Sequence, residues 1–436
     1  MIHCLSNVLA PRTIPLTPSS MPHFLLTPVG SHGDVHPFVA LGKGLLARGH
    51  RVTMITAEPF RGVAERNGLT FVPTLSTDDY NALMSHPDLW HPRKGLTVIF
   101  NPELMRKTFP IAFQAIRERY EPGQTALVGG TLSYASRIAH EALGVPYATV
   151  HLQPMSCCSV TDPPVDSSGW SGTWLPSPLI RLAYWIAEKW ITDPKLAPQI
   201  NEFRATLNLR PVKRIITKWS PSPQWVIGLF PDWFGPIQDG GPTFRHAGFV
   251  PFDDAGGRPT PPEVLAFIKV GPPPVIFSFG SAMRAGRPYF EAAVEACTTL
   301  GIRGILLAKG GDQIPPSLPA NVIHAEYAPF SEVFPLAACV VHHGGIGTSA
   351  QAMQAGVPQL VMPLAFDQAD NAARMKRLGV VKTLFPKRFT GKNVAKVLNA
   401  ILNDREQTAM AKDVSQRTDG FDGLTKACGY VEALIR

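Results

Sequence analysis

The sequence lacks the patterns expected of disulfide-stabilised, metal-binding or membrane-spanning proteins. It has six cysteines in 436 residues, and none forms a CxxC pair or stands at metal-ligand spacing from a histidine. No run of 18 or more apolar residues occurs, the length that crosses a bilayer as a helix. We therefore expect reduced, buried thiols in a cytoplasmic protein, and no metal site.

Basic residues outnumber acidic ones without forming a long basic run. The 41 Lys and Arg against 33 Asp and Glu give a net charge of +8 and a pI of about 9.2. This balance favours anionic ligands, or peripheral attachment to the anionic inner face of a membrane. Because the basic residues are scattered, we expect no nucleic-acid partner.

The first residues predict a disordered extension, residues 1–21. Prolines interrupt the short apolar part of MIHCLSNVLAPRTIPLTPSS, and the apolar core of a signal peptide is missing.

From residue 22, strand-like apolar runs alternate with amphipathic stretches, which is typical of parallel βαβ units. Strands are expected at 23–28, 51–57, 126–130, 146–152, 275–280, 304–309, 339–343 and 358–363. We predict an α/β protein of two facing Rossmann-like domains with the active site in the cleft between them, because ligands bind at the carboxyl ends of parallel strands. The expected parts are a domain at 22–240, a linker at 241–262, a domain at 263–415, and a C-terminal helix at 416–436 that packs back toward the first domain.

The strongest local signal is VVHHGGIGTSAQAMQAGVPQLVMPLAFDQADNA, residues 340–372. A strand ends at His343, and glycines lead into a helix opened by Thr348, so free N–H groups can converge on a phosphate. Taken alone, the same pattern suits an ordinary strand–turn–helix unit. Carboxylate and amide groups that grip sugar hydroxyls follow the next strand, at Asp367, Gln368 and Asn371.

These residues resemble the donor-binding region of family 1 nucleotide-sugar glycosyltransferases of the GT-B fold, whose bacterial and sterol-type members carry HHG, GT, AGVPQ and DQ in this order. The resemblance implies three groups of donor contacts. The diphosphate would be held by Ser281, His343, Gly345, Gly347 and Thr348, the base and ribose by Tyr327, Ala328 and Gln351, and the sugar by Asp367, Gln368 and Asn371. Tyr327 stands where the family usually has a base-stacking Trp.

The segment VGSHGDVHPFVALGKGLLARGH, residues 29–50, resembles the family's GSRGDVQP opening. The resemblance implies that Asp34 is the catalytic base, a role that needs a carboxylate within ~3 Å of the attacking hydroxyl. By position alone, Asp34 reads as a helix cap. His32 and His36 are nearby alternatives, His32 first, and the plainer interpretation of each is a residue that lines the wall of the site.

Four further segments resemble, more narrowly, the rhamnosyltransferases of rhamnolipid synthesis: HPDLWHP (86–92), LAPQINEFRATLNLRPVKRIITKW (196–219), SPQWVIGLFPDWFGP (222–236) and YAPF (327–330). This likeness implies transfer of a hexose, rhamnose or glucose, from a dTDP- or UDP-sugar to a lipophilic acceptor such as a hydroxy-fatty-acid dimer. A UDP-glucose-dependent sterol, polyketide or other natural-product glucosyltransferase is the alternative.

The acceptor is expected on the first domain, at the Pro-rich segment 153–190. Its aromatic residues, Trp174 among them, follow the strand end at His151, and these two residues are the predicted acceptor contacts. Leu179, Leu182, Ile186 and Trp190 share one helical face, which we interpret as core.

The expected reaction is an inverting displacement with a transition state of oxocarbenium character. No Asp-x-Asp occurs, so helix N–H groups are expected to replace a metal, and no cofactor is implied. Two alternatives from other classes are open: a Rossmann oxidoreductase, for which GSHGDV has the wrong glycine spacing, and a non-catalytic nucleotide-sugar binder.

Overall fold

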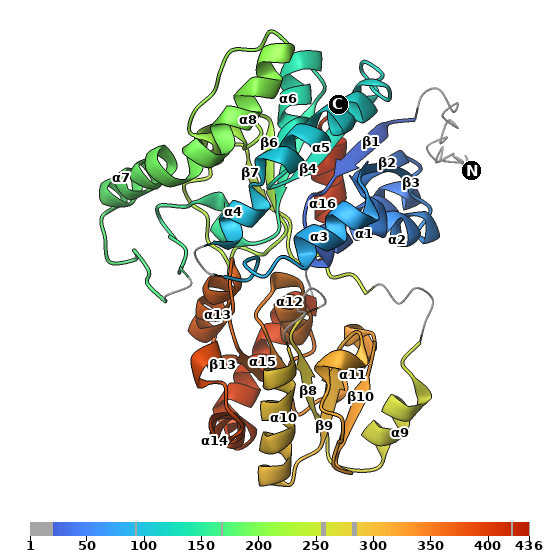
Figure 1. The fold of residues 1–436 in the computed structure, drawn as a ribbon, viewed down its shortest axis with the longest axis vertical. Coiled ribbons are helices and arrows are strands. Elements are labelled where there is room, and N and C mark those ends of the chain that lie inside the picture. Colours follow the sequence, from blue (N-terminus) through green and yellow to red (C-terminus); the bar gives the residue numbers. More distant parts are fainter. Residues whose placement is uncertain are drawn as a thin grey trace, which may run out of the picture.

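The computed structural model describes residues 21–91, 94–166, 169–253, 259–280, 286–419 and 422–435. Two parallel sheets lie in two lobes, which Figure 1 shows one above the other. We refer to residues 21–253 as the N-terminal half and to residues 259–419 as the C-terminal half. None of the helices in these described ranges is long and apolar enough to cross a membrane.

The N-terminal half is built on a seven-stranded sheet of order β3-β2-β1-β4-β5-β6-β7. Its strands are β1 (His23–Thr27), β2 (Arg51–Ala57), β3 (Thr70–Leu75), β4 (Thr125–Gly130), β5 (Tyr147–His151), β6 (Trp225–Gly228) and β7 (Phe244–His246). Its helices are α1 (His32–Ala47), α2 (Arg61–Arg66), α3 (Thr77–Met84), α4 (Gly95–Ile99), α5 (Pro102–Arg117), α6 (Tyr134–Leu143), α7 (Ser177–Ala187) and α8 (Asp193–Thr206).

The C-terminal half repeats this strand order in six strands, β10-β9-β8-β11-β12-β13. Its strands are β8 (Val275–Ser278), β9 (Gly304–Leu307), β10 (Val322–Ala325), β11 (Cys339–His342), β12 (Gln359–Val361) and β13 (Val381–Thr383). Its helices are α9 (Pro262–Lys269), α10 (Arg287–Leu300), α11 (Phe330–Val333), α12 (Ile346–Gln354), α13 (Gln368–Arg377), α14 (Gly391–Leu402) and α15 (Arg405–Asp419).

Both sheets reverse strand order between their first and fourth strands, β1 and β4 in one half and β8 and β11 in the other. Such a switch point opens a crevice at the carboxyl ends of the strands, where ligands of doubly wound proteins bind. The segments after β1, β8 and β11 are therefore the places to look for a site.

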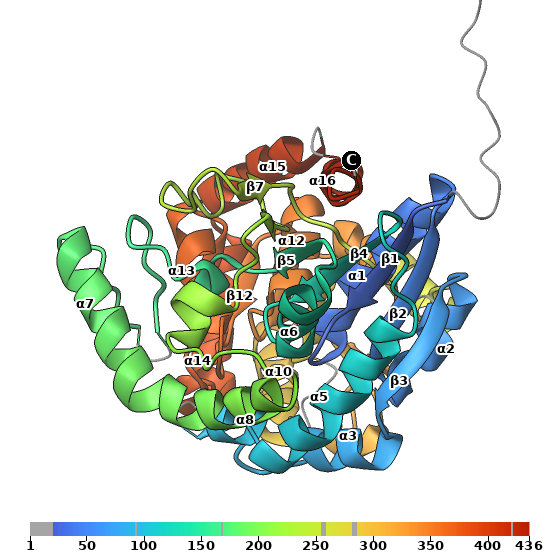
Figure 2. The same cartoon turned by 90° about the horizontal axis from the view of Figure 1, so that it is seen from above.

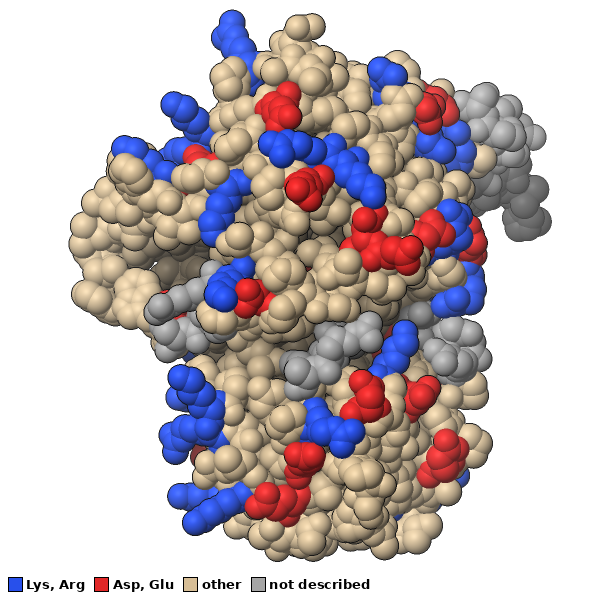
Figure 3. All heavy atoms as spheres, in the orientation of Figure 1, with Lys and Arg blue, Asp and Glu red and all other residues tan. Residues whose placement is uncertain are grey.

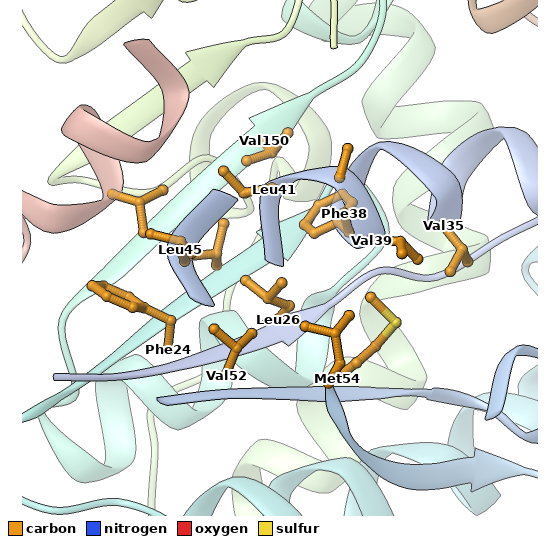
Figure 4. Close-up of a cluster of buried hydrophobic side chains, with 14 of the residues drawn as sticks. Phe24, Leu26, Val35, Phe38, Val39, Leu41, Leu45, Val52, Met54 and Val150 are labelled. Carbon is orange, nitrogen blue, oxygen red and sulfur yellow. The ribbon is translucent and has the colours of Figure 1, made fainter. Parts of the chain in front are cut away.

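Apolar packing fixes the helices on the sheets. In Figure 4, the inward side chains of β1 and β2 meet one face of α1, through Phe24, Leu26, Val52, Met54, Phe38, Leu41 and Leu45, all buried. Because these strands are buried, they appear in the sequence as nearly continuous apolar runs.

The last helix, α16 (Gly423–Glu432), packs on α1 of the N-terminal half, as Figure 1 shows. A Cβ on Gly44 would lie 2.8 Å from the sulfur of Cys428, so the two helices touch closely. Glu432 accepts hydrogen bonds from Arg48 at 3.1 Å and pairs with His50 at 2.8 Å. The chain thus crosses between the halves twice.

Two expectations need correction. The linker is expected to begin at residue 241, but β7 pairs with β6, so the first sheet runs to His246. A three-residue edge strand between Pro- and Gly-rich flanks gives too little pattern to be recognised. The stripe Leu179, Leu182, Ile186 and Trp190 is expected in the core, yet these side chains are between 46% and 68% exposed on α7 and the turn after it. Apolar periodicity shows that a helix has an apolar face, and it does not show what that face contacts.

Candidate active site between the two halves

Asp34 stands at the first turn of α1, directly after β1. Its Oδ2 accepts hydrogen bonds from the backbone N–H of Ser31 at 2.7 Å and from the Ser31 hydroxyl at 3.0 Å. The side chain therefore does cap the helix, as its position predicts. Gly30 is required next to it, because a Cβ there would lie 2.3 Å from Oδ2 and the Gly30 φ is +140°. Burial raises the pKa of the Asp34 carboxyl, against the two hydrogen bonds, which lower it.

His32 and His36 flank this carboxyl on α1. Their rings meet edge to face at 5.3 Å, and His32 also contacts Phe60, while His36 contacts Phe252. Both rings are thus packed into an aromatic wall.

The two histidines at the end of β11 differ in their contacts. His342 is fully buried; its Nε2 lies 2.8 Å from Oε1 of Gln359, and its Nδ1 accepts from the N–H of Gly344 at 3.1 Å. It therefore holds the glycine turn in place. Burial lowers its pKa to about 3, so the ring stays neutral.

His343 faces the switch point of the second sheet, between two glycines. A Cβ on Gly280 would lie 2.8 Å from its Cε1, and a Cβ on Gly345 would lie 2.6 Å from its Nε2. Only glycine leaves room for the ring at both positions. Burial lowers the pKa of His343 to about 4, against a hydrogen bond to the Ser278 backbone, which raises it. At neutral pH the imidazole is therefore uncharged, with one N–H donor that a ligand would share with Ser278 or take over from it.

Helix α12 starts at this turn without a side-chain cap on Gly345. Thr348 lies in its first turn and is half-buried, as Gly347 is. The first N–H groups of an α-helix have no partner within the helix, and the helix dipole adds positive potential there. The start of α12 can therefore receive an anion.

Asp367 sits at the start of α13, on the loop after β12. The preceding residue, Phe366, has a φ of +57°, an unusual value for a non-glycine residue, and its ring contacts Trp90 of the N-terminal half at 5.6 Å. Burial raises the pKa of Asp367 to about 7, and the charges of Asp34 and Asp370 push it in the same direction. Asp34 and Asp367 thus interact across the interface of the two halves.

Two of the predicted sugar contacts are engaged within the protein. The Oε1 of Gln368 accepts from the N–H groups of Leu364 at 2.7 Å and Ala365 at 3.1 Å, which leaves its amide nitrogen as the group to offer a ligand. Asn371 is fully buried, and its Nδ2 donates to the Gly344 carbonyl at 2.9 Å and to Oδ2 of Asp367 at 2.6 Å. Asn371 is therefore a positioning residue that ties the glycine turn to Asp367.

The other predicted contacts are distributed as follows. Tyr327, after β10, and Gln351, on α12, are half-buried, whereas the side chain of Ala328 is 2% exposed within the apolar core, so only its backbone can serve a ligand. Ser281 lies outside the described residues. The structure does not bring the two acceptor residues to one surface. His151 is 3% exposed, with Nδ1 3.0 Å from the Thr131 hydroxyl, and burial lowers its pKa to about 4, whereas Trp174 is 73% exposed.

A buried ion cluster next to the site is not anticipated from the sequence. On α13, the Nε of Arg374 donates to Asp370 at 2.8 Å, and its Nη1 donates to Asp162 of the N-terminal half. Asp162 also accepts from Arg377 at 3.0 Å, and Asp370 accepts from the backbone N–H of Val165 at 3.0 Å. Segment 158–166 is thereby fastened to the helix that carries Gln368 and Asn371. The spacing of Asp370 and Arg374, four residues apart in QADNAARMKR, is the available signal.

Comparison with known proteins identifies the class of enzyme. Residues 24–161 match the glycosyltransferase family 28 N-terminal domain, and residues 305–419 match the erythromycin biosynthesis protein CIII-like C-terminal domain. The O-mycaminosyltylonolide 6-deoxyallosyltransferase of Streptomyces fradiae is 30% identical over 426 residues, which cover 94% of this chain and 96% of that enzyme. The sterol 3-beta-glucosyltransferase of Candida albicans is 27% identical over 437 residues, and the match spans 94% of this chain and 28% of that longer enzyme.

Solved structures show the same fold. The glycotransferase of kitacinnamycin superposes with a TM-score of 0.72 at 20% identity, covering 95% of this chain and all of the other. The glycosyltransferase VinC, solved in complex with dTDP, superposes with a TM-score of 0.67 at 18% identity, covering 95% and 99%.

The fold and the family matches define a nucleotide-sugar glycosyltransferase. The chain belongs to family 1 of the GT-B glycosyltransferases, as its motifs predict. The oxidoreductase and the non-catalytic binder are therefore set aside. The narrower resemblance to the rhamnosyltransferases of rhamnolipid synthesis stays a prediction, because the relatives named above are a sterol and an O-mycaminosyltylonolide glycosyltransferase.

Proposed function

We propose that the protein transfers a hexose, with inversion, from a dTDP- or UDP-sugar to a hydroxyl of a lipophilic small molecule. One observation supports this most. The carboxylates of Asp34 and Asp367, from opposite halves, are close enough for the charge of one to raise the pKa of the other. Asn371 links Asp367 to the glycine turn that opens α12, which supports the proposal that the base, the sugar site and the phosphate site adjoin one another.

In the proposed reaction, Asp34 takes the proton of the acceptor hydroxyl, and the hydroxyl oxygen attacks the anomeric carbon. The bond from that carbon to the diphosphate breaks, and its electron pair leaves with the diphosphate. Burial raises the pKa of Asp34, which makes the ionised carboxylate a stronger base than a solvated one. Both hydrogen bonds from Ser31 go to Oδ2, so Oδ1 is the oxygen that receives the proton.

The leaving diphosphate is proposed to bind at the start of α12, with the neutral ring of His343 and the hydroxyl of Thr348 as donors. Oriented N–H groups stabilise the developing negative charge there without a metal or another cofactor. The nucleoside is proposed to lie along Tyr327, Gln351 and the backbone of Ala328. The sugar is proposed to contact Asp367 and the amide nitrogen of Gln368.

The relatives bear on the acceptor. Their names specify a sterol and O-mycaminosyltylonolide, so we propose a polycyclic or macrocyclic natural product as the acceptor class. A hydroxy-fatty-acid dimer is the second candidate, supported by the narrower resemblance of segments 86–92, 196–219 and 222–236.

The test is a matrix of dTDP- and UDP-linked rhamnose and glucose against four acceptors: a sterol, a macrolactone, a hydroxy-fatty-acid dimer and a glycopeptide. We expect transfer to at least one of the first three, with inverted configuration by NMR, and transfer slower by about 10²-fold or more in the Asp34→Asn variant. Transfer to the glycopeptide alone would refute the lipophilic acceptor, and a retained configuration would refute the mechanism.

A further inference from the structure

Helix α7 contacts the rest of the N-terminal half along a narrow line. Ile180 is buried, Tyr184 donates its hydroxyl to the Ser159 carbonyl at 2.9 Å, and Glu188 is buried against Arg214. These three residues are four apart, so they lie on one side of the helix. Figures 1 and 2 show α7 at the edge of the molecule, projecting from the N-terminal half.

The opposite side of the helix is apolar and exposed. We define the α7 face as Leu179, Leu182, Trp185, Ile186, Trp190 and Ile191, which are between 41% and 68% exposed. The last two follow α7 in a π-helical turn, η4 (Glu188–Thr192). Two further tryptophans on the preceding segment, Trp170 and Trp174, are 52% and 73% exposed. A contiguous patch of this kind marks an interaction surface.

The exposed charges on α7 and its π-helical turn have one sign. Arg181 and Lys189 are exposed there, and the only acidic residue between 169 and 191, Glu188, is buried and paired. On the preceding segment, Asp166 is exposed and accepts a hydrogen bond from the backbone N–H of Trp170 at 3.0 Å. The ammonium of Lys189 lies 4.8 Å from the ring centre of Trp185 and 5.1 Å from that of Trp190. Figure 3 shows the projecting part of the molecule as a largely uncharged surface.

From this pattern we infer that the α7 face docks on the surface of an anionic lipid bilayer. Tryptophans beside basic residues suit the bilayer interface, where indole rings sit at headgroup level and cations reach the phosphates. A symmetric contact with a second copy fits less well, because it would bring Arg181 and Lys189 of both copies together with no exposed acid on the face to pair with them. Lipid phosphates supply the missing anions.

Docking of this kind would also orient the active site. Segment 158–166, which receives the hydrogen bond of Tyr184, is fastened to α13 through Asp162. A lipophilic acceptor partitions into the bilayer. Docking through α7 would therefore place the bilayer, and the acceptor in it, beside the part of the enzyme that carries α13. This consequence rests on the proposed function, whereas binding to the bilayer does not.

The experiment is sedimentation with vesicles of phosphatidylcholine, with and without phosphatidylglycerol. We expect the protein to bind the anionic vesicles with a blue shift of its tryptophan fluorescence. Binding should fall roughly tenfold or more in the Trp185→Ala/Trp190→Ala variant and in the Arg181→Glu/Lys189→Glu variant. The matched control is Lys392→Glu/Lys396→Glu, an equal charge change on exposed residues of α14, which should bind like the wild type.

The inference is wrong if the wild type ignores anionic vesicles, if either α7 variant binds as well as the wild type, or if the control loses as much as the α7 variants. It is also wrong if light scattering shows that the wild type self-associates and the Trp185→Ala/Trp190→Ala variant loses this self-association while its binding to vesicles is unchanged. The affinity for dTDP, measured by calorimetry without vesicles, should be equal in all these proteins, because the proposed nucleotide contacts lie in the C-terminal half. If the wild type transfers sugar to none of the acceptors of the matrix above, the proposed function fails, whatever the vesicles show.

Discussion

At the scale of the residue, Asp34 combines a structural contact with the proposed catalytic one. Its Oδ2 closes the first turn of α1 through Ser31, and the charge of its carboxylate raises the pKa of Asp367 in the other half. A helix cap and a general base need different properties. The cap needs an oxygen acceptor, and the base needs an ionisable one. A substitution that keeps the first and removes the second separates the two roles.

Asp34→Asn is that substitution, because an amide oxygen can still accept from Ser31. We expect unchanged folding and nucleotide binding, and a turnover lowered by about 10²–10⁴-fold, the usual effect of losing a general base. Steady-state kinetics and calorimetry with dTDP and UDP measure both. Turnover within a few-fold of the wild type would remove Asp34 from the mechanism, and His32→Ala would be measured next.

Asp367 provides a prediction on pH and stability. Its pKa is about 7 in the folded protein against an ordinary value near 3.8, so its ionisation destabilises the fold progressively as pH rises from about 4 through 7. Asp367→Asn keeps the oxygen that accepts from Asn371. It should therefore raise the Tm at pH 8, by a few degrees, and leave it unchanged at pH 4.

Asp404→Asn is the contrasting control for this experiment. The backbone of Gln407 and the side chain of Lys382 hold the pKa of Asp404 below its usual range, so its charge stabilises the fold at neutral pH and the effect is lost in acid. This variant should lower the Tm slightly at pH 8. If both variants shift the Tm in the same direction at pH 8, the assignment of Asp367 as a destabilising charge is wrong.

At the scale of the element, the start of α12 and the start of α13 are proposed to bind different parts of the donor. His343→Ala and Thr348→Ala should weaken binding of bare dTDP or UDP, because they remove donors to phosphate. Asp367→Ala and Gln368→Ala should mainly raise the KM for the intact nucleotide sugar. Calorimetry with the bare diphosphate separates the two sets. Equal losses for His343→Ala and Asp367→Ala would show that the two subsites are assigned wrongly.

The elements also show how far the sequence can lead. The buried central strands β1, β8 and β11 are predicted within two residues of their ends, because burial on both faces gives a continuous apolar run. The edge strands β7, β10 and β13 have three or four residues, and their identity depends on a neighbour that the local sequence does not contain. For α7, the periodicity predicts the apolar face correctly, but the prediction that this face lies in the core is wrong, because the face is exposed.

The same distinction holds for the candidate site. Asp34 and His343 can be found because they follow β1 and β11, strands at the two switch points, in motifs with glycine, and Asp367 can be found because polar residues cluster after the predicted strand 358–363. Their roles are implied by the resemblance to the family and not by position alone. The roles of Gln368 and Asn371 within the protein cannot be found, because they depend on the loop 364–365 and the turn at Gly344. Asp162 is missed for the same reason, since its partners Arg374 and Arg377 are more than 200 residues away.

At the scale of the whole molecule, the two halves are joined on the side of α13 by an apolar cluster and by the ion cluster. Phe230 and Phe234 of the N-terminal half pack with Met375 and other apolar residues of the C-terminal half. Arg374, 2% exposed, reaches from α13 to Asp162 and the Phe234 carbonyl. The relative position of the halves sets the approach of Asp34 to Asp367, so this joint matters for the proposed reaction.

The final prediction compares two arginines that share Asp162. Arg374→Ala leaves Asp162 and Asp370 buried without their main partner, which should lower the free energy of unfolding by about 3–5 kcal/mol. Arg377→Ala removes an ion pair in which the arginine side chain is half-exposed. The free energy of unfolding should therefore fall by less than about 1 kcal/mol. Urea unfolding measures both free-energy losses.

The ion cluster also holds the two halves together. Arg374→Ala should therefore enlarge the radius of gyration in X-ray scattering and raise the KM for the donor, whereas Arg377→Ala should do neither. If the two variants lose equal stability, or if the radius stays constant while Arg374→Ala unfolds more easily, the ion cluster stabilises α13 locally and does not set the distance between the halves.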